Sequence, residues 1–186
     1  MSEKTSKPKK NSYLDWAKAI IIAVVLAAII RWFLFEPYMV EGSSMFPTLK
    51  DGEKLFVNKT VHYIGKVQRG NIVIIDGEKE NLHYVKRVIG LPGDTIEAKD
   101  DKVMVNGKVL PEPYLKHNES EAMQLGLHLT ADFGPKKVPE GMYFVMGDNR
   151  LNSMDSRNGL GLIKQNRIVG KSEFIFFPFN EMKQTK

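Results

Sequence analysis

Cysteine is absent from this chain of 186 residues, and its absence excludes disulfide bonds, thiolate metal sites and cysteine nucleophiles together. Two binding motifs are also missing. In the polar segment 147–161, Arg150 stands where a calcium loop needs its second acidic ligand, and Gly159 stands where the loop needs its closing glutamate. The segment Gly170–Ser172 resembles the end of a P-loop, but Gln165 occupies the position of the first glycine. We therefore expect neither a metal nor a cofactor.

A nucleic-acid surface is missing as well, despite a formal net charge of +5. Much of the positive excess lies in the tail of residues 1–12, and no later stretch interleaves basic and aromatic residues as a nucleic-acid surface does. We therefore expect no nucleic-acid partner. Apolar residues make up 42% of the chain and charged residues 26%, a balance typical of a folded protein.

A long apolar run, Ala19–Ile30, follows the basic tail. Residues 13–35 together exceed the roughly 20 residues that a helix needs to cross a bilayer. A buried core helix would show a polar face, which this run lacks. A signal peptide cleaved near residues 25–27 would leave an apolar new terminus. We therefore predict an uncleaved single transmembrane helix at 13–35.

The charges on either side of this helix predict its orientation. The tail 1–12 is basic, whereas Glu36 and Glu41 follow the helix. Basic flanks stay in the cytoplasm. We therefore expect a single-pass protein of the cell membrane, in contact with the lipid bilayer, with a cytoplasmic N-terminus and residues 36–186 outside.

Short β-branched or aromatic runs bounded by glycine predict a mainly β domain of antiparallel sheets over residues 36–186. The Asn106-Gly107 pair lies between two such runs and is a strong hairpin signal. The polar segment 111–141 is expected to be an exposed excursion with one short helix near 120–125. The predicted strands are Lys54–Lys59, Asn71–Asp76, Leu82–Ile89, the hairpin in Asp101–Leu110, Met142–Met146 and Lys171–Phe179.

Two adjacent serines, Ser43 and Ser44, lie shortly after the apolar run and before Pro47. A serine hydroxyl is a poor nucleophile until a base takes its proton. Histidine is the usual base, and spacing alone does not exclude a Ser-His-Asp triad, because its members meet only in the folded chain. The four histidines are His62, His83, His117 and His128.

Lys86 is the other candidate base. If Tyr84–Val88 is a strand, Lys86 shares one face with Tyr84 and Val88. Burial of that face would lower the pKa of Lys86, and the charge of Arg87 would act in the same direction. Periodicity alone also allows the opposite arrangement, in which Val85 points inward and Lys86 points to water.

The loop Gly147–Gly161 is rich in charged and amide side chains. Asp148 and Asp155 can pair with Arg150, Arg157 or Arg87, either as a solvated turn or as a scaffold for the base. Ser153 would be a suitable hydrogen-bond partner for a neutral lysine.

Three blocks in this order, behind one N-terminal apolar segment, resemble the bacterial type I signal peptidases, in the single-anchor Gram-positive form. The blocks are Gly42–Thr48 (GSSMFPT), Tyr84–Asp94 (YVKRVIGLPGD) and Gly147–Arg157 (GDNRLNSMDSR). The resemblance implies an all-β serine endopeptidase that removes signal peptides after Ala-x-Ala through an acyl-enzyme. It also implies partners, namely signal peptides of secretory preproteins and the secretion translocon.

The resemblance assigns roles to matching residues. Ser44 matches the nucleophile, Lys86 the general base and Ser153 the serine that hydrogen-bonds the lysine. Two supporting ion pairs are implied, Asp155 with Arg157 and Asp148 with Arg87. The residues expected in the oxyanion hole and substrate groove are Gly42, Ser43, Met45 and Tyr84.

The chain departs from the family pattern at two positions. Gly42 stands where some members carry a serine that helps to hold the oxyanion, so backbone N–H groups would carry that task here. Leu151 stands where an aspartate is frequent, and we interpret it as neutral for the chemistry. Two alternatives remain: a membrane-tethered, non-catalytic β module that binds exported chains or the translocation machinery, and another kind of Ser-Lys peptidase, which would need no anchor.

Overall fold

The computed structural model describes residues 12–62, 67–77 and 82–185. The chain divides into two units, residues 1–35 and residues 36–186.

The first unit contains one helix, α1, at Ser12–Leu34. The described side chains of this helix, residues 13–28, are exposed, although most of them are apolar. Within the described ranges, no helix is both long enough and apolar enough to cross a membrane. The helix predicted for residues 13–35 is present, and its membrane span is not confirmed.

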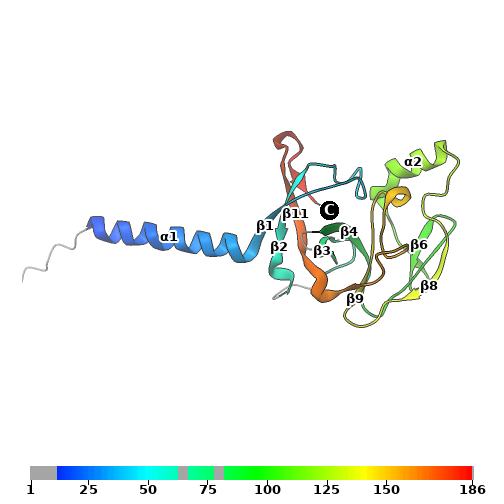
Figure 1. The fold of residues 1–186 in the computed structure, drawn as a ribbon, viewed down its shortest axis with the longest axis horizontal. Coiled ribbons are helices and arrows are strands. Elements are labelled where there is room, and N and C mark those ends of the chain that lie inside the picture. Colours follow the sequence, from blue (N-terminus) through cyan, green and yellow to red (C-terminus); the bar gives the residue numbers. More distant parts are fainter. Residues whose placement is uncertain (1–11, 63–66, 78–81, 186) are drawn as a thin grey trace, which may run out of the picture. The chain divides into compact units, whose positions relative to one another are not determined.

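The second unit is built on an antiparallel sheet, to which eight strands of the described residues belong (Figure 1). Its strand order is β1-β2-β11-β3-β4-β9-β10, with β12 paired to β11. The strands are β1 Phe35–Met39, β2 Lys54–Asn58, β3 Ile72–Asp76, β4 His83–Gly90, β9 Met142–Met146, β10 Ile163–Lys164, β11 Ile168–Phe177 and β12 Lys183–Gln184.

A smaller antiparallel sheet has the order β7-β6-β5-β8. Its strands are β5 Thr95–Lys99, β6 Lys102–Val105, β7 Lys108–Val109 and β8 Phe133–Lys137. The helix α2, at Lys116–Gln124, lies on the same side of the domain as β6 and β8 (Figure 1). Short 3-10 helices occupy Lys59–His62, Pro113–Leu115, Arg150–Asn152, Gln165–Arg167 and Phe179–Glu181.

The strand β3 shows why the core lies on both faces of the large sheet. Successive side chains of a strand point to opposite faces. Accordingly Ile72 and Ile74 enter one apolar cluster, whereas Val73 and Ile75 enter another. All four are buried, so β3 and its neighbour β4 are held rigidly at the centre of the domain.

The predicted fold class, mainly β with antiparallel sheets, is confirmed. The Asn106-Gly107 hairpin joins β6 to β7, and both residues have the positive φ that a tight hairpin turn requires, 53° and 74°. Two strands of the smaller sheet, β5 and β8, were not predicted. β5 alternates apolar and polar residues over only five positions, Thr-Ile-Glu-Ala-Lys, and β8 shows no apolar alternation, since it reads Phe-Gly-Pro-Lys-Lys.

The prediction that 111–141 is an exposed excursion is wrong in part. Leu115, Ala122 and Leu129 form a small buried cluster, and β8 is a strand of the second sheet. The predicted helix is present but begins four residues earlier, at Lys116. The prediction relied on the polar composition of this segment. A few buried apolar residues are nevertheless enough to hold a short segment against the rest of the domain.

Candidate active site

Ser44 lies in the loop between β1 and β2, where the chain turns sharply. Gly42 has a φ of +85°, a conformation that glycine adopts without steric penalty. The turn is closed by hydrogen bonds from Phe46 N to the Ser43 carbonyl at 3.0 Å and from Leu49 N to the Met45 carbonyl at 3.0 Å. Ser44 is half-buried at the surface of this turn.

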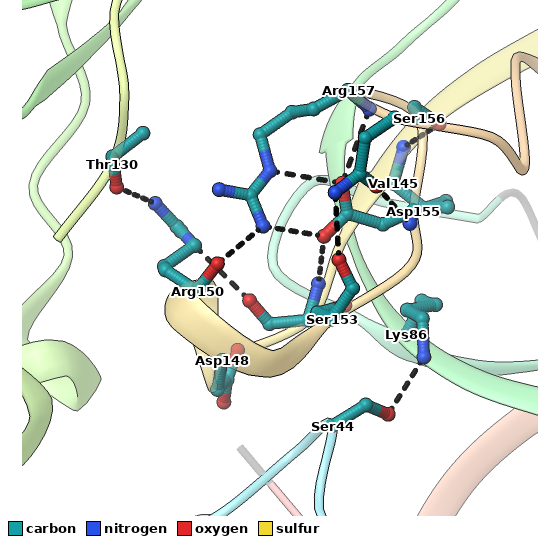
Figure 2. A network of polar contacts seen from close by, with 12 residues as sticks. Ser44, Lys86, Thr130, Val145, Asp148, Arg150, Ser153, Asp155, Ser156 and Arg157 are labelled. Carbon is teal, nitrogen blue, oxygen red and sulfur yellow. Dashed lines mark hydrogen bonds and ion pairs between the residues drawn. The ribbon is translucent and has the colours of Figure 1, made fainter.

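Lys86 lies in the buried half of β4 and is only 3% exposed. Its Nζ donates to the Ser44 Oγ at 2.7 Å (Figure 2). It also donates to the Val85 carbonyl at 3.0 Å. The predicted contact between Ser44 and Lys86 is therefore present. Of the two orientations that the sequence allowed, Lys86 takes the inward one.

Burial is the main cause that lowers the pKa of Lys86, from 10.5 to about 8. The carboxylates of Asp155 and Asp148 act in the opposite direction. The expectation that Arg87 helps to lower this pKa is not supported. Its guanidinium faces Asp148, so its charge is matched locally.

Arg87 and Asp148 form a fully buried ion pair, as the sequence predicted. The Arg87 Nε and Nη2 donate to the two Asp148 carboxylate oxygens at 2.8 and 2.7 Å, a bidentate arrangement. Thr48, four residues after the nucleophile, donates from its Oγ1 to the same carboxylate at 2.5 Å. This pair therefore joins the three sequence blocks at one point.

The second predicted pair, Asp155 with Arg157, is also present. Arg157 Nη2 and Nε donate to the Asp155 carboxylate, each at 2.9 Å (Figure 2). Burial raises the pKa of Asp155, but the Arg157 guanidinium and the Gly147 N–H outweigh it and hold that pKa below its usual value. Asp155 therefore stays charged behind Lys86.

Ser153 is buried beside the nucleophile, but its predicted hydrogen bond to Lys86 is not found. Among the described residues, the Ser153 Oγ has no hydrogen-bond partner. The backbone of Gly147 packs so closely against Ser153 and Ser44 that no side chain would fit at this position. A Cβ on Gly147 would lie 2.3 Å from the Ser153 Oγ and 2.4 Å from the Ser44 carbonyl oxygen.

The four expected groove residues have different surroundings. Gly42 and Ser43 are exposed, and the Ser43 Oγ accepts a hydrogen bond from Asn152 Nδ2 at 2.8 Å. Tyr84 is half-buried, with the Lys86 Nζ 5.9 Å from its ring centroid. The placement of Met45 in the groove is wrong, because its side chain is 1% exposed and packs in an apolar cluster. The turn directs the Met45 side chain into the domain, away from solvent.

The histidines make other contacts. His83 lies 3.1 Å from Asp76, His128 lies 3.1 Å from Asp101, and His117 packs edge-on against Phe46. The side chain of His62 lies outside the described residues. Within the described part of the chain, the base in contact with Ser44 is Lys86.

Several contacts around the site were missed by sequence reasoning. Asn149 donates from its backbone N–H to the Ser44 carbonyl at 3.0 Å and from Nδ2 to the Ser43 carbonyl at 3.1 Å. Arg150 bonds Glu112, as well as Thr130 at 3.0 Å (Figure 2), from the segment predicted to be exposed. Asn149 and Arg150 lie inside the third block, and Arg150 was considered only as a partner of Asp148 or Asp155, whereas the sequence held no signal for Glu112 or Thr130.

A serine hydroxyl in contact with a buried lysine of lowered pKa can act as a nucleophile with its own base. The geometry therefore fits a serine hydrolase whose base is lysine. The family of signal peptidases, peptidase S26, matches residues 13–177, and the chain belongs to it. It is accordingly a serine endopeptidase, and the predicted family is confirmed.

Curated relatives agree along the whole length. The chain is 69% identical over 185 residues to "Signal peptidase I T" of Bacillus subtilis (strain 168), covering 100% of this chain and 96% of the relative. It is 67% identical over 185 residues to "Signal peptidase I" of Bacillus amyloliquefaciens, with the same coverage. A crystal structure of a signal peptidase I from Enterococcus faecalis V583 is 38% identical, with a TM-score of 0.52, and covers 57% of this chain and 96% of that one.

Proposed function

We propose that this chain removes N-terminal signal peptides from exported preproteins, with Ser44 as the nucleophile and Lys86 as the general base. One observation carries the proposal. The amine of a lysine that is 3% exposed lies 2.7 Å from the hydroxyl of Ser44. A general base must be within hydrogen-bond reach of the proton it takes, and its pKa must lie near the working pH.

The reaction begins when neutral Lys86 takes the proton of Ser44. The Ser44 Oγ then attacks the carbonyl carbon of the scissile bond, and Lys86 gives that proton to the leaving amine. An acyl-enzyme remains, which a water deprotonated by Lys86 hydrolyses, so that the serine and the neutral lysine are restored. Activity therefore rises with pH through the lowered pKa of Lys86, about 8, and is lost in acid.

The two buried ion pairs, Arg87 with Asp148 and Arg157 with Asp155, hold the elements that carry Lys86 and Ser44 in place. Asp148 neutralises Arg87, which would otherwise place a free charge beside Lys86. Asp155 is held by Arg157 and accepts the Gly147 N–H at 3.0 Å. Ser153 is buried next to the pair Ser44 and Lys86, the proposed catalytic dyad, and its hydroxyl has no hydrogen-bond partner among the residues that the structure describes. Its place suits a partner that orients the lysine amine during the reaction.

The proposed substrate carries Ala-x-Ala before the cut, bound in a shallow groove as an added strand. Backbone hydrogen bonds would hold the peptide, and small pockets would select the alanines. Gly42 offers no side chain to the oxyanion, so backbone N–H groups such as that of Ser44 are the proposed donors.

We also propose that residues 13–35 anchor the enzyme in the cell membrane, with a cytoplasmic N-terminus, an extracytoplasmic catalytic domain and the secretion translocon as a neighbour. The support is the apolar run of the sequence and the exposure of its side chains from residue 13 to residue 28. The non-catalytic module offers no role for the contact between Ser44 and Lys86, and no observation favours it.

The first test is cleavage of a peptide that contains Ala-x-Ala by the detergent-solubilised full chain. We expect Ser44→Ala and Lys86→Ala each to lower kcat by roughly 10⁴- to 10⁶-fold, because the two residues act as one unit. Ser120→Ala and Lys99→Ala, exposed residues of the same types, serve as matched controls and keep wild-type activity.

Circular dichroism establishes that each variant is folded before its rate is compared. A folded Lys86→Ala that keeps most of the activity would place the base elsewhere and return the histidines to consideration. A wild type that never cuts the peptide would instead favour the binding module.

A further inference from the structure

Asn118 is a buried amide in the first turn of α2, far along the chain from both Ser44 and Lys86. Its side chain is 3% exposed, although its neighbours His117 and Glu119 are exposed. Buried polar side chains are nearly always hydrogen-bonded, and Asn118 is no exception. Its Nδ2 donates to the carbonyl oxygen of Phe46 at 2.9 Å and to that of Asp148 at 2.8 Å.

The two acceptors identify the nitrogen of this amide. Both are carbonyl oxygens, which accept hydrogen bonds and cannot donate them, so the group that faces them must be the NH2. An amide NH2 has two hydrogens, and both are used here. Among the described residues, the Asn118 Oδ1 has no partner, so the contacts of this side chain are made through its donors.

One of the two acceptors lies in the turn that carries Ser44, and the other lies in the loop that supports Lys86. Phe46 follows the nucleophile Ser44 by two residues and lies in the same turn. Asp148 holds Arg87, the neighbour of Lys86 in β4, at 2.7 Å. The single amide of Asn118 therefore joins the main chain of the nucleophile turn to the loop that supports the base.

The segment around Asn118 is itself fixed against the same loop. Tyr114 lies with its ring centroid 3.9 Å from the Arg87 guanidinium carbon. Glu112 forms a buried ion pair with Arg150. Leu115, directly before α2, and Ala122 on α2 pack in the small apolar cluster described above. The amide is thus presented from a rigid helix and not from a free loop.

We propose that Asn118 is a positioning residue that sets the geometry between Ser44 and Lys86 by tying the Phe46 and Asp148 carbonyls together. The inference rests on the proposed function, because it assumes that these two residues are the dyad. Asn118 touches neither reacting atom. Thr48 and Asn149 also link the nucleophile turn to the Asp148 loop, so removal of Asn118 loosens this connection without breaking it. The nucleophile turn can then shift relative to β4, and a misplacement of about 1 Å can lower a rate by roughly 100-fold.

The test compares Asn118→Ala with the wild type in the peptide assay, using the detergent-solubilised full chain. We expect kcat to fall by roughly 10- to 100-fold and KM to change by less than about 3-fold, because dyad geometry governs the chemical step. Gln124→Ala is the matched control. It removes another amide from α2, where the side chain is exposed, and leaves kcat and KM unchanged.

A second variant, Asn118→Asp, separates the hydrogen bonds from the packing. Aspartate has the size of asparagine, but its carboxylate has no hydrogen to donate and would face two carbonyl oxygens. We expect it to lower kcat at least as much as Asn118→Ala does. Single-turnover acylation should slow in parallel in both variants, which a loss of stability alone would not produce at a temperature where each variant is folded.

Three results would overturn the inference: a kcat within twofold of the wild type in either folded variant, an effect confined to KM, or a failure of both variants to fold at any assay temperature, which would make Asn118 a folding residue. The failure of the proposed function gives a different result. Either the wild type would not cut the peptide, or Ser44→Ala or Lys86→Ala would keep most of the activity, whatever the Asn118 variants do.

Discussion

Lys86 illustrates how one residue can serve catalysis at the expense of stability. The unfolded lysine holds its proton up to about pH 10.5, whereas the folded one loses it above about 8. Between these values the unfolded state binds more protons, so the stability of the fold rises with pH. Below pH 8 both states are protonated, and the burial penalty is constant and at its largest. The lowered pKa of Lys86, from 10.5 to about 8, corresponds to a penalty of about 3 kcal/mol.

This linkage predicts that Lys86→Met, although inactive, raises the free energy of unfolding at pH 7. The gain is about 1–3 kcal/mol, since the loss of the hydrogen bond to Ser44 offsets part of the 3 kcal/mol. Urea unfolding of both proteins between pH 7 and 10.5 should show the difference shrinking as pH rises. A difference that is independent of pH would mean that Lys86 titrates normally in the folded protein.

The elements around the site show which features could be predicted from sequence. The turn at Asn106 and Gly107 was predicted because its signal is local, two adjacent residues that favour positive φ. The inward orientation of Lys86 was not decided by sequence, because alternation fits either face of β4. The role of Asn118 left no signal at all, since nothing in a polar segment marks which amide becomes buried.

The loop after β9 predicts a sharp effect at Gly147. A Cβ at this position would lie 2.3 Å from the Ser153 Oγ and 2.4 Å from the Ser44 carbonyl oxygen. Gly147→Ala should therefore destabilise the fold by about 1–3 kcal/mol and lower kcat by roughly 100-fold. Chemical unfolding and the peptide assay measure the two effects.

Gly134 in β8 provides the matched control, because a Cβ there would meet no atom within 4 Å. Gly134→Ala should change stability by less than about 0.5 kcal/mol and leave kcat unaltered. Equal effects of the two substitutions would show that crowding at Gly147 is not the cause, because the change in unfolded-chain entropy is the same at both positions and favours the folded state.

At the scale of the whole molecule, the division at residue 35 predicts that residues 36–186 fold without residues 1–35. The core clusters, the dyad and both sheets, apart from Phe35 at the start of β1, lie within residues 36–186. We expect the shortened chain to unfold in a single cooperative transition and to cut a soluble Ala-x-Ala peptide with a kcat within about tenfold of the full chain. Calorimetry and the peptide assay test this expectation. A shortened chain without a thermal transition would show that residues 1–35 are needed for folding.

The contacts that make the site join distant parts of the chain. Ser44 and Lys86 are 42 residues apart, Asn118 and Phe46 are 72 apart, and Asn149 and Ser43 are 106 apart. Contacts between such distant residues form late in folding, because long loops must close first. Until then Lys86 is a solvated, protonated lysine and Ser44 an ordinary hydroxyl. A newly made copy therefore cannot cleave neighbouring proteins before it has folded. Folding itself activates the enzyme, a task that in a zymogen falls to proteolytic cleavage.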